Sequence, residues 1–124
     1  MTHSVLIVDD ERDAVDALKV YLDGQDFKVR LAYSGSEGLK AVQEAKPDLV
    51  LLDLAMPGMD GWQALKLMKA SIPDLRVVIL TGSVPDRNLE EQVKQAGAIG
   101  ILTKPIQIDE LTPKIRSFIA GGKP

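Results

Sequence analysis

Short apolar runs alternate with longer amphipathic stretches along the whole chain. The short runs are typical of β-strands, and they cover residues 4–8, 27–33, 48–52, 75–80 and 98–103. Three of them are nearly continuous in aliphatic residues, as expected for strands that are covered on both faces of a sheet. The longer stretches repeat apolar residues at helical spacing, and they cover residues 12–24, 35–45, 62–71, 86–96 and 109–120.

Five strands, each followed by a helix, predict an α/β domain with a parallel sheet and right-handed crossovers. Asp109 would be the N-cap of the last helix, and Pro113 at the end of its first turn would remove at most one backbone hydrogen bond. We expect a single domain over residues 1–120, followed by a C-terminal tail or linker stub over 121–124.

Polar side chains with reactive groups follow four of the five predicted strands. In a parallel α/β sheet the carboxyl ends of the strands lie along one edge, and ligands bind there. Neighbouring strands are about 4.8 Å apart, so side chains at neighbouring strand ends are within reach of one another. The residues expected at this edge are, in chain order, Asp9, Asp10, Glu11, Asp53, Thr81 and Lys104.

Several carboxylates at one sheet edge call for a compensating cation. Carboxylates packed together repel one another and raise each other's pKa unless positive charge is near. Lys104 supplies one such charge, and we expect a divalent ion to supply the rest. No cysteine occurs in the chain, and its one histidine, His3, precedes the first predicted strand instead of following one, so the ligands would all be oxygen. Oxygen ligands with positions left for water favour Mg²⁺ (or Mn²⁺) over zinc or copper.

Composition narrows the class of protein further. The chain has 124 residues, a net charge of −3, and 45% hydrophobic and 27% charged residues. This balance provides no overall basic field for binding nucleic acid or anionic lipid. The absence of cysteine excludes disulfides, and the apolar run nearest the N-terminus is too short to cross a membrane. We therefore expect a cytoplasmic domain that binds neither nucleic acid nor membrane.

An acid, a metal ion, a lysine and a hydroxyl at one edge suit the handling of a phosphoryl group. A carboxylate such as Asp53 can attack phosphorus and form an acyl phosphate. The metal and Lys104 would offset the charge that develops on the transferred oxygens. Thr81 could donate a hydrogen bond to a phosphoryl oxygen, and the adjacent Gly82 leaves space for a tetrahedral group.

Four short motifs, in this order and spacing, resemble the receiver domain of two-component response regulators. They are "LIVDDE", "LLDLAMPGMDG", "LTGS" and "TKP", and the resemblance covers residues from about 4 to 120. It implies a flavodoxin-like (βα)5 three-layer sandwich with a five-stranded parallel sheet of order 2-1-3-4-5. It also implies that Asp53 accepts a phosphoryl group from a phosphohistidine on a histidine kinase or a phosphotransfer protein.

The resemblance assigns metal ligands by position. Asp10 would contact Mg²⁺ directly and Asp9 mostly through water. Asp53 would supply a carboxylate oxygen, and Ala55 its backbone carbonyl. An alanine at position 55 offers no group that could guide or block an attacking water, so we expect no unusual self-hydrolysis of the acyl phosphate.

The resemblance also assigns a conformational switch. Lys104 would pair with Asp53 or with its phosphate, and the Lys104–Pro105 peptide bond would be cis. Thr81 would move inward to bind the phosphate. Ile101 stands at the switch position, where the family commonly has an aromatic ring that turns inward as the threonine moves. The face formed by residues 86–96, 98–103 and 109–120 would contact an output domain or partner, in a monomer or a phosphorylation-dependent dimer.

Competing interpretations differ in the features that they require. The leading one is a signalling switch that promotes its own phosphorylation and dephosphorylation, rather than an enzyme. An aspartate-nucleophile phosphatase typically has a second acid where Ala55 stands, and a flavin mononucleotide carrier would not place acids after its first strand. A degenerate receiver that serves as an interaction scaffold is the remaining alternative. His3 has no expected partner, and Trp62 is expected to be buried or half-buried.

Overall fold

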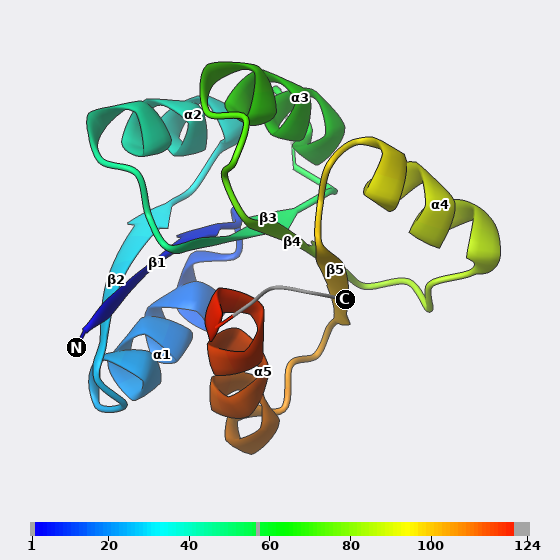
Figure 1. Cartoon of the computed structure of the whole chain (residues 1–124). Helices are drawn as coiled ribbons and strands as arrows, with labels where there is room; N and C mark the ends of the chain where they lie inside the picture. Colours follow the sequence, from blue (N-terminus) through cyan, green and yellow to red (C-terminus); the bar gives the residue numbers. More distant parts are fainter. Residues whose placement is uncertain (1, 57, 121–124) are drawn as a thin grey trace.

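The computed structural model describes residues 2–56 and 58–120. Strands and helices alternate strictly along the chain (Figure 1). In chain order they are β1 (His3–Val8), α1 (Arg12–Asp23), β2 (Phe27–Ala32), α2 (Gly35–Glu44), β3 (Leu49–Asp53), α3 (Gly61–Ser71), β4 (Val77–Thr81), α4 (Arg87–Gln95), β5 (Gly100–Thr103) and α5 (Ile108–Ala120).

The strands form one parallel sheet in the order β2-β1-β3-β4-β5. Helices α1 and α5 cover one face of this sheet, and α2, α3 and α4 lie on the other (Figure 1). The structure therefore confirms the flavodoxin-like (βα)5 sandwich and its 2-1-3-4-5 strand order. No helix within residues 2–56 and 58–120 is both long enough and apolar enough to span a membrane.

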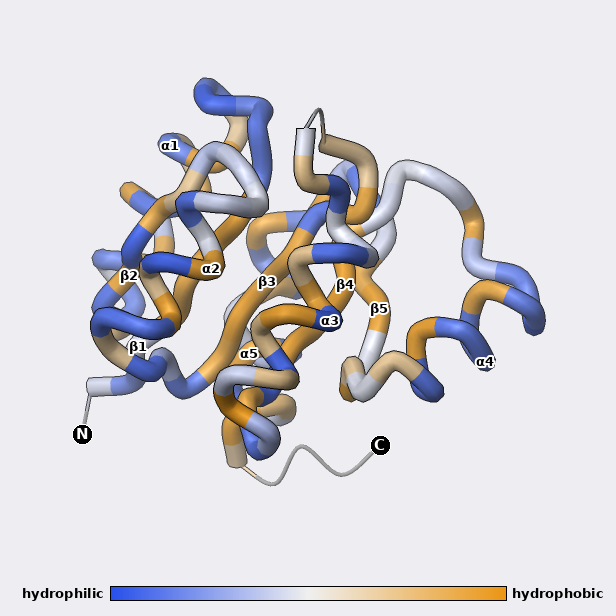
Figure 2. Tube along the Cα trace, turned by 90° about the horizontal axis from the view of Figure 1, so that it is seen from above, coloured by the Kyte–Doolittle hydropathy of each residue, from blue (hydrophilic) through white to orange (hydrophobic). Residues whose placement is uncertain are grey.

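Alternate residues of the central strands pack into two separate apolar clusters. Val50 and Leu52 of β3 belong to the cluster beneath α2, α3 and α4, whereas Leu49 and Leu51 belong to the cluster beneath α1 and α5. All four are fully buried. Figure 2 shows β3 and β4 as apolar segments at the centre, while polar segments lie toward the outside of the molecule. Burial on both faces explains why these strands read as continuous aliphatic runs.

Some of the predicted boundaries are corrected by the structure. α5 begins at Ile108, because the carbonyl of Gln107 accepts hydrogen bonds from the amides of Glu110 and Leu111. Asp109 therefore lies in the first helical turn, and its predicted role as the N-cap is wrong. β3 begins and ends one residue later than the predicted range 48–52, so Asp53 is the last residue of the strand itself. The proposed tail over 121–124 lies outside the described residues.

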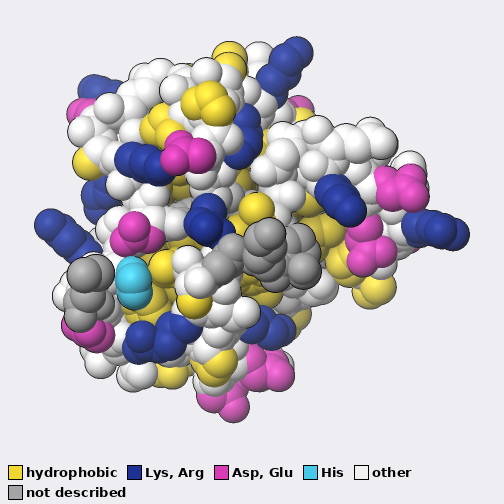
Figure 3. All heavy atoms as spheres, viewed as in Figure 1, with side chains coloured by type: hydrophobic (Ala, Val, Ile, Leu, Met, Phe, Trp, Pro, Cys, Tyr) yellow, Lys and Arg dark blue, Asp and Glu magenta, His cyan; other side chains and the backbone are white. Residues whose placement is uncertain are grey.

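Charged side chains are dispersed over one face of the molecule. On the face shown in Figure 3, basic and acidic side chains are interspersed rather than gathered by sign.

The expectation that His3 lacks a partner is wrong, because its Nδ1 lies 3.7 Å from Oδ2 of Asp48, just before β3. The pairing of β1 with β3 brings these two residues together across 45 positions of sequence. Trp62 is half-buried at the start of α3, as expected.

Candidate functional site

The ends of β1 and β3 bring three carboxylates together. The two strands are neighbours, and Val8 is in register with Leu52, so Asp9 and Asp53 leave adjacent strands at the same level. Both are buried, with 2% and 4% of their surface exposed, whereas Asp10 is exposed. One oxygen from each of Asp9, Asp10 and Asp53 lies within 4.8 Å of the other two. The predicted gathering of acids at this edge is therefore present.

Backbone amides hold the two buried carboxylates in place. Oδ1 of Asp9 accepts a hydrogen bond from the amide of Glu11 at 3.0 Å, and Oδ1 of Asp53 accepts one from the amide of Ala55 at 3.2 Å. Gly61, the first residue of α3, packs directly against the backbone of Asp53. A methyl group on Gly61 would lie 2.3 Å from the carbonyl oxygen of Asp53. Only glycine permits an approach this close. Each carboxylate thus keeps one oxygen, Oδ2, turned toward the lysine.

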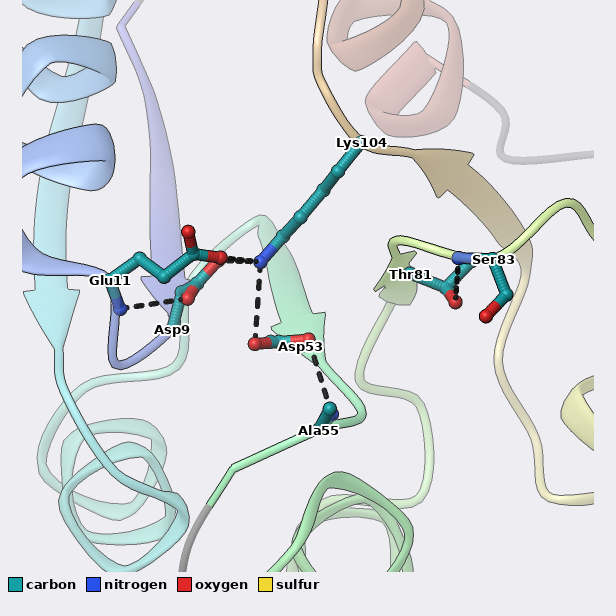
Figure 4. Close-up of polar contacts among 7 residues, drawn as sticks. All are labelled: Asp9, Glu11, Asp53, Ala55, Thr81, Ser83 and Lys104. Atoms are coloured by element: carbon teal, nitrogen blue, oxygen red, sulfur yellow. Dashed lines mark hydrogen bonds and ion pairs between the residues drawn. The ribbon is translucent and has the colours of Figure 1, made fainter.

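Lys104 reaches across the sheet edge from the end of β5 and contacts three acids (Figure 4). Its Nζ lies 2.6 Å from Oδ2 of Asp9, 2.7 Å from Oε1 of Glu11 and 3.3 Å from Oδ2 of Asp53. Its backbone amide donates a 2.7 Å hydrogen bond to the carbonyl of Thr81. The Lys104–Pro105 bond is cis, as the resemblance implies.

Burial and neighbouring charges set the protonation of this cluster. Burial raises the pKa of Asp53 and the charge of Asp9 raises it further, while the Ala55 amide and Lys104 act in the opposite direction. Burial by itself lowers the pKa of Lys104, but hydrogen bonds to Asp9 and Glu11 outweigh it and leave that pKa above its ordinary value. Lys104 is therefore charged at neutral pH, and its one positive charge faces several carboxylates.

The donor set suits a hard divalent cation. All three candidate ligand atoms are carboxylate oxygens, and Asp10 is open to solvent, so water and a substrate oxygen have room to complete the coordination. This combination matches the preference of Mg²⁺ for a few carboxylates together with waters. Receiver domains bind Mg²⁺ at an acidic aspartate cluster of this kind.

Thr81 and Ile101 lie apart from the ion-pair cluster. Thr81 is the last residue of β4 and is 8% exposed, and its Oγ1 accepts a 3.1 Å hydrogen bond from the amide of Ser83. Among the described residues, no hydrogen bond joins the Thr81 hydroxyl to Asp53 or Lys104, and Figure 4 shows this hydroxyl directed to Ser83. Ile101 on β5 is half-buried against the apolar cluster beneath α4.

The structure gives Glu11 a partner that the sequence did not indicate. Glu11 was expected at this edge as one of three consecutive acids after the first strand, with no partner assigned to it. The structure instead places its carboxylate on Lys104, 93 residues away in sequence. Three consecutive acids after a strand exceed what a helix start requires, and this excess was the available signal.

Comparison with known proteins decides the family. The model of the response regulator receiver domain matches residues 5–116. The chain belongs to the response regulator receiver domain family. This domain is the signalling module of two-component systems and is phosphorylated on aspartate.

The receiver's relatives agree with this assignment. Sporulation initiation phosphotransferase F of Bacillus subtilis is 33% identical over 119 residues, which cover 96% of this chain and 95% of that protein. Response regulator GacA of Pseudomonas syringae is 39% identical over 94% of this chain and 55% of its own length. The chain thus spans nearly all of the first relative and about half of the second.

Solved structures show the same fold. The chemotaxis protein CheY4 of Vibrio cholerae superposes with a TM-score of 0.88 at 25% identity, covering 94% of this chain and 98% of that one. A CheY-like receiver domain protein from Methanospirillum hungatei gives 0.90 at 25% identity, covering 98% and 97%. NtrX of Brucella abortus gives 0.88 at 27% identity, covering 98% of this chain but 28% of NtrX.

Proposed function

We propose that Asp53 is the phosphoacceptor of this receiver, and that it takes its phosphoryl group from a phosphohistidine on a histidine kinase or phosphotransfer protein. One observation carries the proposal: Asp53 is buried at the carboxyl edge of the sheet, beside Asp9 and within 3.3 Å of the Lys104 ammonium. Burying an acid beside further acids costs stability, and groups held in this way cluster at functional sites.

The transfer follows from the positions of these groups. An oxygen of Asp53 forms a new bond to phosphorus while the bond from phosphorus to the donor's imidazole nitrogen breaks and leaves its electron pair on that nitrogen. Lys104 faces the charge that develops on the phosphoryl oxygens. Asp10, Asp53, the Ala55 carbonyl and, through water, Asp9 would hold Mg²⁺. When bound, this ion offsets the negative charge that otherwise keeps an anionic donor away.

A groove beside the site supports a protein as the donor. It has a volume of about 500 Å³ and runs between α1 and the loop that joins β5 to α5. Asp9, Glu11 and Lys104 line it, and Leu18 and Ile108 are among its apolar residues. Ile108 is 40% exposed. An apolar groove that leads to a charged reaction centre suits a partner surface that carries a reactive histidine.

Phosphorylation would then act as a switch rather than as a step in catalysis. A phosphoryl group brings roughly −2 charge and strong acceptor oxygens, enough to draw Lys104 and the Thr81 hydroxyl toward it. Thr81 would give up its hydrogen bond from Ser83, and the space beside Ile101 would be repacked. The readout would be a changed affinity of the α4–β5–α5 face for an output domain, a partner or a second copy of the chain.

The experiment is phosphorylation by acetyl phosphate in the presence of MgCl2, followed by intact mass. Wild type should gain one acid-labile phosphoryl group, and EDTA should prevent this. Asp53→Asn should gain none, while Asp60→Asn, a matched change in the same loop, should be labelled like wild type. Persistent labelling of Asp53→Asn would place the acceptor elsewhere. Failure of wild type to be labelled would favour a receiver that serves only as an interaction scaffold.

A further inference from the structure

Glu11 occupies the N-cap position of α1 but does not cap that helix. Its side chain makes no hydrogen bond to the backbone amides of the first turn, in contrast to Ser34, Asp60 and Asp86, which cap α2, α3 and α4. Its Oε1 instead lies 2.7 Å from Nζ of Lys104. A residue at a position suited to capping has therefore been directed across the site to the lysine (Figure 4).

The three ion pairs of the Lys104 ammonium differ in length. The ammonium lies closest to Asp9 and Glu11, at 2.6 and 2.7 Å, and its distance to Asp53 is 3.3 Å. The first two acids both belong to the segment between β1 and α1. Lys104 is thus drawn toward α1, and its contact with the acceptor carboxylate is the longest of the three.

We infer that Glu11 is a positioning residue that holds the Lys104 ammonium on the α1 side of the site in the unphosphorylated receiver and releases it to the phosphoryl group. The inference rests on the proposed function of Asp53. An ammonium has three N–H groups, and oxygens of three carboxylates already lie within 3.3 Å of the Lys104 nitrogen. A contact with a phosphoryl oxygen must therefore replace an existing one.

Solvent exposure determines which contact is given up. The side chain of Asp9 is 3% exposed, so breaking its pair would leave a buried charge without compensation. The side chain of Glu11 is 61% exposed, and water can solvate its carboxylate once the lysine leaves. The ion pair with Glu11 is therefore the one that Lys104 loses at least cost in free energy. This ion pair competes with the binding of Lys104 to the phosphoryl group.

Glu11→Gln tests this competition, with Asp13→Asn as the matched control. Asp13 lies in the first turn of the same helix, and no ion pair between described residues links it to Lys104. Both variants remove one negative charge near the site, but only the first removes a partner of the lysine. The probe is beryllofluoride with MgCl2, a noncovalent mimic of the phosphoryl group, and its affinity is measured by titration.

Glu11→Gln should bind beryllofluoride about two- to five-fold more tightly than Asp13→Asn, the range expected for loss of an exposed ion pair. A second readout needs neither metal nor mimic: in EDTA, the ¹⁵N resonance of the Lys104 ammonium should shift in Glu11→Gln and stay in place in Asp13→Asn. Equal affinities of the two variants, weaker binding by Glu11→Gln, or an unmoved lysine resonance would overturn the inference while leaving Asp53 as acceptor. Failure of wild type to bind beryllofluoride would remove both the proposed function and the inference.

Discussion

Gly61 offers the sharpest test of how the fold positions the acceptor. It is the first residue of α3, and its amide donates a hydrogen bond to the carbonyl of Leu54. A methyl group at this position would lie 2.3 Å from the carbonyl oxygen of Asp53 and 2.4 Å from Cα of Leu54. Both neighbours are backbone atoms, so no side-chain rotation can relieve the contact.

The magnitude follows from these distances. The atoms must separate by about 1 Å to reach ordinary van der Waals contact, and a forced shift of this kind costs about 1–3 kcal/mol of stability. The backbone that must shift includes Asp53 itself, and misplacement of a reacting group by about 1 Å lowers a rate about 100-fold. Gly61→Ala should therefore reduce both the free energy of unfolding and the rate of labelling by acetyl phosphate.

Urea unfolding monitored by circular dichroism measures the first effect, and intact mass over time measures the second. Gly82→Ala is the matched control for stability, because a methyl group there would meet no atom within 4 Å. It should stay within about 0.5 kcal/mol of wild type. A Gly61→Ala protein as stable as Gly82→Ala, labelled at the wild-type rate, would refute the claim that this close approach holds Asp53 in place.

Three further predictions concern individual acids. Asp10→Asn should weaken Mg²⁺ binding as measured by calorimetry. In EDTA the same variant should have a Tm up to about 3 °C higher than wild type, because the change relieves repulsion between carboxylates. A lower Tm would contradict the claim that the carboxylates repel one another. Burial raises the pKa of Asp53 above 3.8 in the folded state. The protonated carboxyl therefore contributes to the free energy of unfolding below pH 3.8, and this contribution is lost as the pH rises through the raised pKa. In EDTA, the stability of Asp53→Asn relative to wild type should thus increase from about pH 4 to 7, and a flat difference would show that the pKa is not raised. Asp60→Ala, which removes the cap of α3, should cost about 1 kcal/mol in urea unfolding, and Asp60→Asn should restore it if capping is the cause.

The architecture and the location of the site could be predicted from the sequence because both depend on local patterns. Aliphatic runs and helical spacing indicated five strands and five helices, and the rule that parallel strands end at one edge placed Asp9, Asp53 and Lys104 together. The chemistry followed from the residue types at that edge. None of these steps required knowledge of a side-chain conformation.

The tertiary structure alone decided how the side chains share that edge. Which acids contact Lys104, and at what distance, depends on the packing of segments more than 90 residues apart, which no local pattern encodes. The same holds for the contact of Gly61 with the backbone of Asp53, and for the pairing of His3 with Asp48. The start of α5 was mispredicted because the backbone carbonyl of Gln107, rather than a capping side chain, begins that helix. Periodicity determines which residues reach the sheet edge, whereas only the packed structure determines which of them meet.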